Sequence, residues 1–80
     1  MTYNEIFDKV AELIVAQLPV TIEQVKPESR LVEDLGADSA NLMMLVMDLE
    51  AEFDLTVDDD AIGTIRTVGD IVDAIMKVKG

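Results

Sequence analysis

The sequence has no cysteine, no histidine and no tryptophan among its 80 residues. Without cysteine the chain has no disulfide, no thiolate nucleophile and no cysteine-ligated metal. Without histidine it also lacks the usual general base of enzymes and the commonest transition-metal ligand. We therefore expect a protein that is not an enzyme.

Basic residues are also scarce: six Lys and Arg stand against 17 Asp and Glu, which gives a net charge of -11. Between residues 31 and 65 there is no Lys or Arg, and ten of the acidic residues lie in that stretch. Such a charge repels nucleic acids and anionic lipids, whereas proteins with basic surfaces complement it. We expect no nucleic-acid partner and basic protein partners.

Long apolar runs are missing as well, because no stretch approaches the roughly 20 residues that a membrane-spanning helix needs. The N-terminal segment is polar and has helical periodicity, which is not the pattern of a secretory signal. With 50% hydrophobic residues the chain can nevertheless form a folded core. We expect a cytoplasmic monomer that does not insert into membranes.

Apolar residues recur at helical spacing in three segments, which predict helices over residues 3–17, 39–53 and from residue 67 to the C-terminal lysines. Thr2 with Glu5 forms a capping-box pattern before the first helix, and Thr67 with Asp70 forms a weaker one before the last. The acidic run at residues 58–60 predicts the start of a short helix between the last two, and Gly63 its end.

Residues 20–37 form a long first connection, and we expect its apolar residues to pin it to the helices. These anchors are Ile22, Val25, Leu31, Val32 and Leu35. No segment alternates well enough to require a sheet. The expected fold is all-α: a single domain over residues 1–80, built as a small four-helix bundle with three longer helices and one short one.

Ser39, at the start of the second helix, has two readings. A serine in this position is commonly a helix cap, because its hydroxyl satisfies a free backbone amide. Asp38, however, is the better cap, which leaves the Ser39 hydroxyl free to be modified by another protein. Catalysis by Ser39 itself would need a general base that the chain does not offer.

Three further groups of residues are candidates for a site: the acidic run at 58–60, the acids at the end of the second helix and the methionines of that helix. The acidic run at 58–60 lacks the ligand spacing of an EF-hand loop, so we predict no metal site. Glu50, Glu52 and Asp54 form either a solvated face or a contact surface. Met43, Met44 and Met47 are either core filler or an adaptable apolar patch for a partner.

Three stretches together resemble the acyl carrier proteins of the dissociated bacterial fatty acid and polyketide synthases. They are EDLGADS at residues 33–39, LEAEFDLTVDDD at 49–60 and IRTVGDIVDAI at 65–75. The resemblance implies a four-helix bundle that carries acyl groups as thioesters on 4'-phosphopantetheine, which is derived from coenzyme A and attached to Ser39, with Asp38 in support. It also implies as partners a holo-acyl-carrier-protein synthase or other phosphopantetheinyl transferase, acyltransferases, and basic-surfaced synthase enzymes.

The same resemblance implies two further sets of residues. The partner-binding set is Asp38, Met43, Met44, Met47, Asp48, Glu50 and Glu52. The set lining an acyl pocket is Leu42, Val46, Leu49, Ile62, Ile65 and Ile71.

The sequence departs from the family pattern just after the serine. Ala40 stands where leucine is usual, and Asn41 and Met44 stand where acidic residues are common. These changes leave three functions open. The chain is a carrier for fatty acid biosynthesis, a specialised carrier for a polyketide or other dedicated lipid pathway, or an unmodified acidic interaction module.

Overall fold

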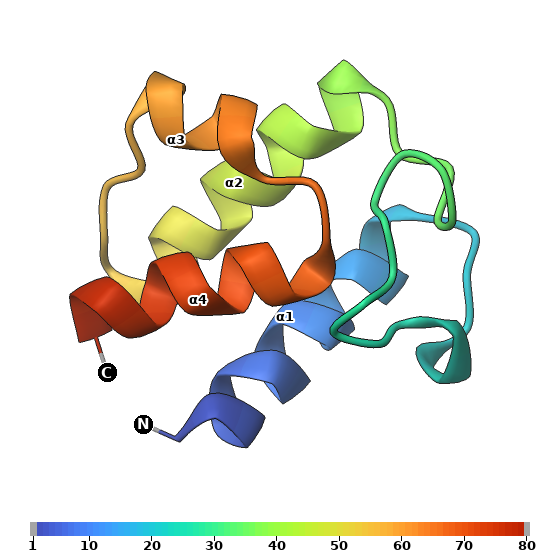
Figure 1. The fold of residues 1–80 in the computed structure, drawn as a ribbon, viewed down its shortest axis with the longest axis horizontal. Helices are drawn as coiled ribbons and strands as arrows, with labels where there is room; N and C mark the ends of the chain where they lie inside the picture. The colour runs from blue at the N-terminus through green and yellow to red at the C-terminus, as the bar shows by residue number, and fades with distance from the viewer. Residues whose placement is uncertain (1, 80) are drawn as a thin grey trace.

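Four α-helices surround one core in the computed structural model, which describes residues 2–79 apart from the side chains of residues 59 and 61 (Figure 1). The helices are α1 (Tyr3–Gln17), α2 (Ser39–Phe53), α3 (Asp59–Thr64) and α4 (Val68–Lys79), and a 3₁₀ turn, η1 (Ile22–Gln24), lies in the first connection. The predicted bundle and the predicted bounds of α1 and α2 are confirmed. Within residues 2–79 no helix is both long and apolar enough to cross a membrane.

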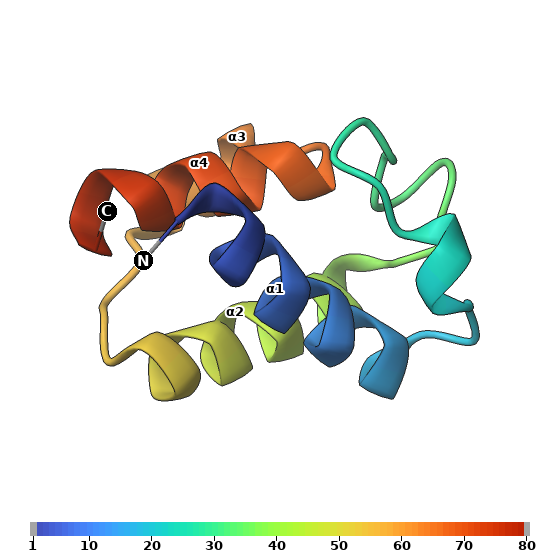
Figure 2. The same cartoon turned by 90° about the horizontal axis from the view of Figure 1, so that it is seen from below.

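Helix α1 is the central element, because both α2 and α4 pack against it (Figure 2). Its buried stripe includes Ile6, Val10 and Ile14, each with no exposed surface. The facing stripes follow the same helical spacing. They are Leu45, Val46, Leu49 and Phe53 on α2, and Val68, Ile71, Val72 and Ile75 on α4.

The predicted capping boxes are present at α1 and α4. At α1, Glu5 donates its amide to Thr2 Oγ1 (3.2 Å) and Thr2 donates its amide to Glu5 Oε1 (3.0 Å). The prediction for Gly63 is wrong: it lies inside α3, which ends at Thr64, and Ile65 caps the helix in an extended conformation. Gly63 is not among the residues with positive φ, so it does not provide the left-handed turn that ends many helices.

At α4, the Asp70 carboxylate accepts hydrogen bonds from the amides of Arg66 (3.0 Å) and Thr67 (3.1 Å), and these lower the pKa of Asp70. Because the folded-state pKa is depressed, the stabilisation is present above the unfolded-state value of about 3.9 and is lost as the pH falls through the folded-state value. We expect Asp70→Asn to lower the free energy of unfolding by about 1 kcal/mol at neutral pH. Urea titrations at about pH 7 and about pH 3 measure this, and an equal difference at both would contradict the prediction.

The first connection is pinned over one end of the bundle by only some of its predicted anchors. Val25, Leu31 and Leu35 are buried, as expected. The prediction is wrong for Ile22 and Val32, which are 54% and 57% exposed. Ile22 and Val32 each lie in a short helical turn, and only one side of such a turn faces the core. In the first turn the inward residue is Val25, which follows η1. In the turn at residues 30–36 the inward residues are Leu31 and Leu35, four residues apart.

Three backbone hydrogen bonds tie this connection to the start of α4. Leu31 donates to the Arg66 carbonyl (2.9 Å), Val68 donates to the Ser29 carbonyl (3.0 Å), and Gly69 donates to the Pro27 carbonyl (2.8 Å). They form around an isolated antiparallel bridge between Arg30 and Thr67. The bridge joins segments far apart in sequence, and it holds the stretch that leads into α2.

Candidate functional site

The start of α2 is built by a reciprocal cap. Asp38 Oδ1 accepts a hydrogen bond from the Asn41 amide (2.9 Å), and Asn41 Oδ1 accepts one from the Asp38 amide (3.2 Å). Asp38 is therefore the cap, as predicted, and Asn41 completes it. The role of Asn41 in the cap was not predicted, although its position three residues after Asp38 is the signal of a capping box.

The residues before the cap fix where α2 begins. Gly36 adopts a positive φ of 75°, which lets the chain turn sharply. Ala37 is buried and donates its amide to the Leu31 carbonyl (2.9 Å). The turn and this anchor together leave Asp38 and Ser39 at the surface.

Ser39 is the first residue of α2, and its side chain is exposed. Its hydroxyl forms no hydrogen bond with any residue that the structure describes. The cap of α2 is Asp38, whose carboxylate accepts the hydrogen bond of the Asn41 amide. The N-terminus of a helix carries free amides and a partial positive charge, which favour an attached phosphate. The site therefore presents an accessible hydroxyl where a phosphodiester is electrostatically tolerated.

The three predicted contact methionines of α2 lie on its outward side. Met43, Met44 and Met47 are 49%, 57% and 64% exposed, so they are not core filler. Ala40 and Ala51 are exposed as well. We call Met43, Met44 and Met47 the methionine face; it begins one turn after Ser39, on the helix that starts with that serine.

The predicted contact acids of α2 make contacts inside the molecule. Asp48 accepts a hydrogen bond from Gln17 Nε2, and Glu52 forms an ion pair with Lys9 (3.1 Å). Glu50 is half-buried, and its Oε2 accepts a hydrogen bond from the Val57 amide (3.3 Å). Asp48 and Glu52 thus connect α2 to α1 by a hydrogen bond and an ion pair. Glu50 holds the link at residues 55–58 against α2 by its hydrogen bond with Val57.

A small apolar cavity of about 10 Å³ lies between α2, α3 and α4, with room for about one water. Five of the six predicted pocket residues line it: Leu42, Val46, Ile62, Ile65 and Ile71. The sixth lining residue is Leu45, which we did not predict, whereas Leu49 is buried in the core outside the lining. Helical spacing places both Leu45 and Leu49 on the buried side of α2. Which of the two lines the cavity depends on where α3 and α4 lie, and the spacing does not show this.

No three Asp, Glu, His or Cys side chains form a metal-binding group among the side chains that the structure describes. In the acidic run that starts α3, Asp58 and Asp60 are exposed, and the side chain of residue 59 lies outside the described part.

Comparison with known proteins gives one family. A family model described as the phosphopantetheine attachment site matches residues 8–75. An acyl carrier protein of Thermotoga maritima is 51% identical over 77 residues, covering 96% of this chain and 95% of that protein. One of Picosynechococcus is 46% identical over 77 residues, with 96% and 95% covered.

A solved acyl carrier protein from Enterococcus faecalis has the same fold, with a TM-score of 0.81, 36% identity, and coverage of 96% of this chain and 98% of that one. The family's cofactor is 4'-phosphopantetheine, and the exposed hydroxyl at the start of α2 is chemically suited to it. This chain belongs to the acyl carrier proteins and contains their phosphopantetheine attachment domain.

Proposed function

We propose that Ser39 is the attachment point of 4'-phosphopantetheine, and that the chain carries acyl groups as thioesters between enzymes of fatty acid biosynthesis. The observation that supports this most directly is the exposed Ser39 hydroxyl at the start of α2, left free because Asp38 and Asn41 cap the helix. The other serine, Ser29, is buried and has both a donor and an acceptor partner.

This chain contributes one group to the attachment reaction, the Ser39 hydroxyl. Ser39 Oγ forms a bond to the phosphorus next to the pantetheine of coenzyme A, the pyrophosphate bond breaks, and the nucleotide half leaves. The hydroxyl proton goes to a base of the transferase, because this chain has no histidine. The bound arm supplies the thiol that a chain without cysteine lacks. The chain is then a carrier and not a catalyst.

The partners are enzymes with Lys and Arg around the binding surface: a phosphopantetheinyl transferase, then acyltransferases and synthase enzymes. The net charge of -11 and the absence of cations between residues 31 and 65 support this. Asp38, Asp48, Glu50 and Glu52 supply negative charge to the contact. The carrier acts as a cytoplasmic monomer, and neither nucleic acid nor a membrane takes part.

Mass spectrometry tests the attachment. The intact chain is incubated with coenzyme A and a broad-specificity phosphopantetheinyl transferase, and its mass is compared with the untreated chain. We expect a gain equal to one phosphopantetheine arm. No gain with a transferase that modifies another acyl carrier protein in the same assay would overturn the proposal.

A specialised lipid or polyketide pathway is the second candidate, and the methionine face supports it. Met44 stands where an acidic residue is common in the family. The surface of α2 that contacts a partner therefore has an apolar centre, the methionine face, and an acidic edge. We expect Met44→Glu to lower kcat/KM of the transferase from the same genome by about tenfold, because the enzyme side of such a contact would be apolar there. Ile22→Glu, at another exposed apolar position, is the matched control. Equal losses in both variants, or a gain for Met44→Glu, would contradict an apolar contact.

A further inference from the structure

Methionine provides all the sulfur in this chain, which has five methionines and no cysteine. Peroxides oxidise protein sulfur, taking cysteine thiolates to sulfenic acids and methionine thioethers to sulfoxides. Before the arm brings a thiol to the chain, a peroxide therefore finds only thioethers. Where the methionines lie in the fold decides which of them it reaches.

The described methionines differ in access. The three residues of the methionine face are exposed on α2. Met76, on α4, is half-buried and packs against the core. A dilute oxidant in solution should thus reach the methionine face first.

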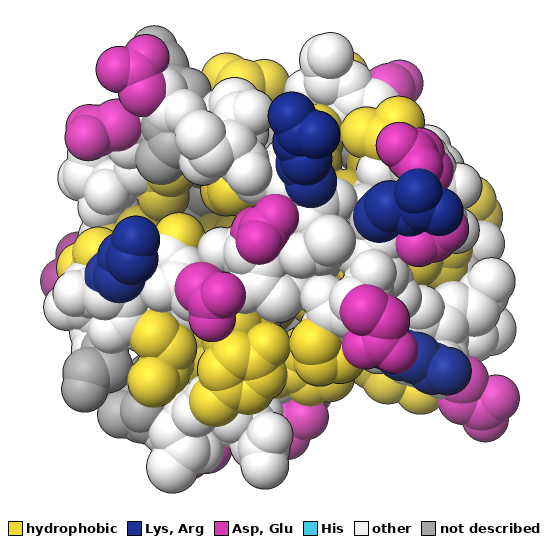
Figure 3. All heavy atoms as spheres, viewed as in Figure 1, with side chains coloured by type: hydrophobic (Ala, Val, Ile, Leu, Met, Phe, Trp, Pro, Cys, Tyr) yellow, Lys and Arg dark blue, Asp and Glu magenta, His cyan; other side chains and the backbone are white. Residues whose placement is uncertain are grey.

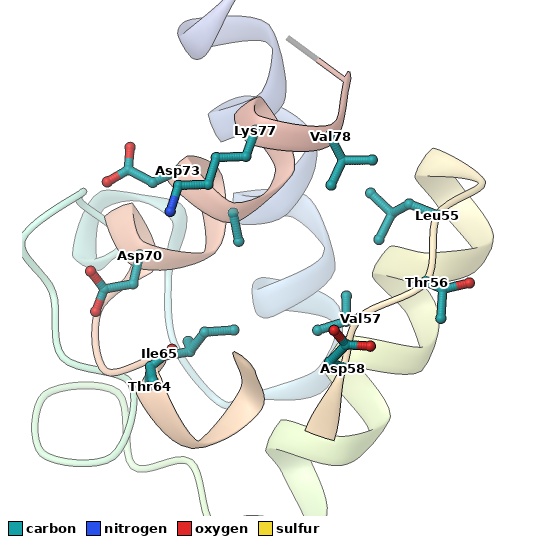
Figure 4. Close-up of a pocket in the computed structure, with 11 residues that line it drawn as sticks. Leu55, Thr56, Val57, Asp58, Thr64, Ile65, Asp70, Asp73, Lys77 and Val78 are labelled. Atoms are coloured by element: carbon teal, nitrogen blue, oxygen red, sulfur yellow. The ribbon is translucent and has the colours of Figure 1, made fainter. Parts of the chain in front are cut away.

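The methionine face is a continuous surface. Met43 and Met47 are four residues apart and Met44 and Met47 are three apart, which makes them neighbours on a helix. Single exposed apolar side chains are ordinary, and Val78 is one of these: Figure 4 shows it on α4 beside Lys77. A group of three on consecutive turns of one helix is instead typical of a contact surface.

This surface lies on the same side of α2 as the attachment site. Ser39, Met43 and Met47 follow one another at intervals of four residues, so they form one stripe, with the two methionines roughly 6 Å and 12 Å from Ser39 along the axis. A protein that binds through a standard interface covers about 800 Å² of its partner, a patch roughly 30 Å across. An enzyme that binds over Ser39 in this way also covers Met43 and Met47.

The charge around α2 selects the oxidant. Figure 3 shows Lys and Arg side chains among Asp and Glu on the side of the molecule that carries α4. Helix α2 has no Lys or Arg, and its charged residues are Asp48, Glu50 and Glu52. Such a surface repels anionic oxidants, whereas hydrogen peroxide and alkyl hydroperoxides are neutral and are not repelled.

We propose that the methionine face is an oxidation site for neutral hydroperoxides, and that its oxidation prevents the transferase from loading Ser39. The inference rests on the proposed function, in which the transferase binds this part of α2. The thioether sulfur attacks one oxygen of the hydroperoxide, the S–O bond forms and the O–O bond breaks. The other oxygen leaves with the proton as water, or as an alcohol from an alkyl hydroperoxide. The sulfur loses two electrons and the hydroperoxide gains them.

The sulfoxide changes what the enzyme meets. A thioether is apolar, whereas a sulfoxide is polar and loses free energy when a contact buries it without a hydrogen bond. The fold keeps its core, because the three side chains lie outside it. Methionine sulfoxide reductases restore the thioether, with a dithiol as reductant and water as the product that takes the oxygen. Oxidation therefore stops loading reversibly.

Peptide mass spectrometry tests the site. The chain without the arm is treated with dilute hydrogen peroxide, catalase removes the excess, and the methionine peptides are followed over time. We expect Met43, Met44 and Met47 to gain one oxygen each before Met76 does. A Met76 that is oxidised as fast as the other three would overturn the assignment of the site to the methionine face.

The kinetics of the transferase from the same genome test the consequence. Its kcat/KM is measured with the untreated chain, the oxidised chain and the oxidised chain after repair by the reductases. We expect oxidation to lower kcat/KM by about tenfold or more, and repair to restore it. An unchanged kcat/KM with all three methionines oxidised would overturn the proposal. So would a loss of helix by circular dichroism, because the lower rate would then follow from unfolding.

Two variants separate the methionine face from other effects of peroxide. The combined variant Met43→Leu, Met44→Leu and Met47→Leu keeps apolar side chains that cannot take up oxygen, and it is compared only with its own untreated sample. We expect peroxide to leave its kcat/KM unchanged. Met76→Leu, outside the face, is the matched control and should lose as much on oxidation as the unaltered chain. An equal loss in the combined variant would contradict the proposal.

The two proposals fail in different ways. An untreated chain that gains no arm mass overturns the attachment at Ser39 and this inference together. A chain that gains the arm equally fast with and without oxygen on the methionine face overturns only the inference.

Discussion

Ser39→Ala is expected to abolish the mass gain from phosphopantetheinylation and to leave the stability of the fold almost unchanged. The hydroxyl is exposed and forms no hydrogen bond with the described residues, so its loss should alter the free energy of unfolding by less than about 0.5 kcal/mol. The Asp38 and Asn41 cap of α2 stays in place. Intact mass after transferase treatment and urea unfolding measure the two halves of this prediction.

Ser29→Ala is the matched control, because Ser29 is the only other serine in the chain. Ser29 Oγ accepts a hydrogen bond from the Lys26 amide (3.0 Å) and donates one to the Gln24 carbonyl (2.9 Å), and the residue is buried. Removing a buried hydroxyl with two partners should cost about 1–3 kcal/mol while the arm is still attached. A mass gain that survives Ser39→Ala would mean that another hydroxyl carries the arm.

The same variant separates a carrier from an unmodified interaction module. If the acidic and methionine surface served only for binding, Ser39→Ala would support every function of the unaltered chain and would bind each partner equally well. If the chain is a carrier, the variant can bind synthase enzymes through α2 but transfers no acyl group. Acyl transfer measured beside partner affinity therefore decides between the two classes.

The sequence predicted the helices well because their signals are local. A capping box spans four residues and a buried stripe repeats within one helix, so the bounds of α1 and α2 follow from neighbours in sequence. The cap at Asp38 and the exposed Ser39 follow from the same local reasoning. Five of the predicted pocket residues were also found on the cavity lining, because they lie on inward stripes of their helices.

Several features that the sequence did not predict depend on contacts between separate segments. Periodicity cannot show that Leu45 faces α3 and α4 in the cavity while Leu49 does not. It cannot show that the Glu50 carboxylate turns toward the Val57 amide, or that residues 27–31 pair with the start of α4.

Gly69 marks the place where this unpredicted pairing is tightest. Its amide donates to the Pro27 carbonyl at 2.8 Å, and a Cβ added to Gly69 would lie 2.9 Å from the same oxygen and 3.4 Å from Tyr3 Oη. The Pro27 oxygen belongs to backbone that is held by the bridge between Arg30 and Thr67, so it cannot move like the end of a flexible side chain. A methyl group at residue 69 must push the connection away from α4 or move the helix.

We expect Gly69→Ala to lower the free energy of unfolding by about 1–3 kcal/mol, as overpacking does elsewhere, and to lower Tm by about 4–8 °C for each kcal/mol. The gain in helix propensity, at most about 1 kcal/mol and smaller in a first turn, does not offset the clash. Gly63→Ala is the matched control, because Gly63 lies inside α3 with nothing within 4 Å of an added Cβ, and it should be stabilising by about 0.5–1 kcal/mol. Thermal and urea unfolding of both variants measure this. If Gly69→Ala were as stabilising as Gly63→Ala, the connection would not be held against α4 as tightly as the 2.8 Å hydrogen bond indicates.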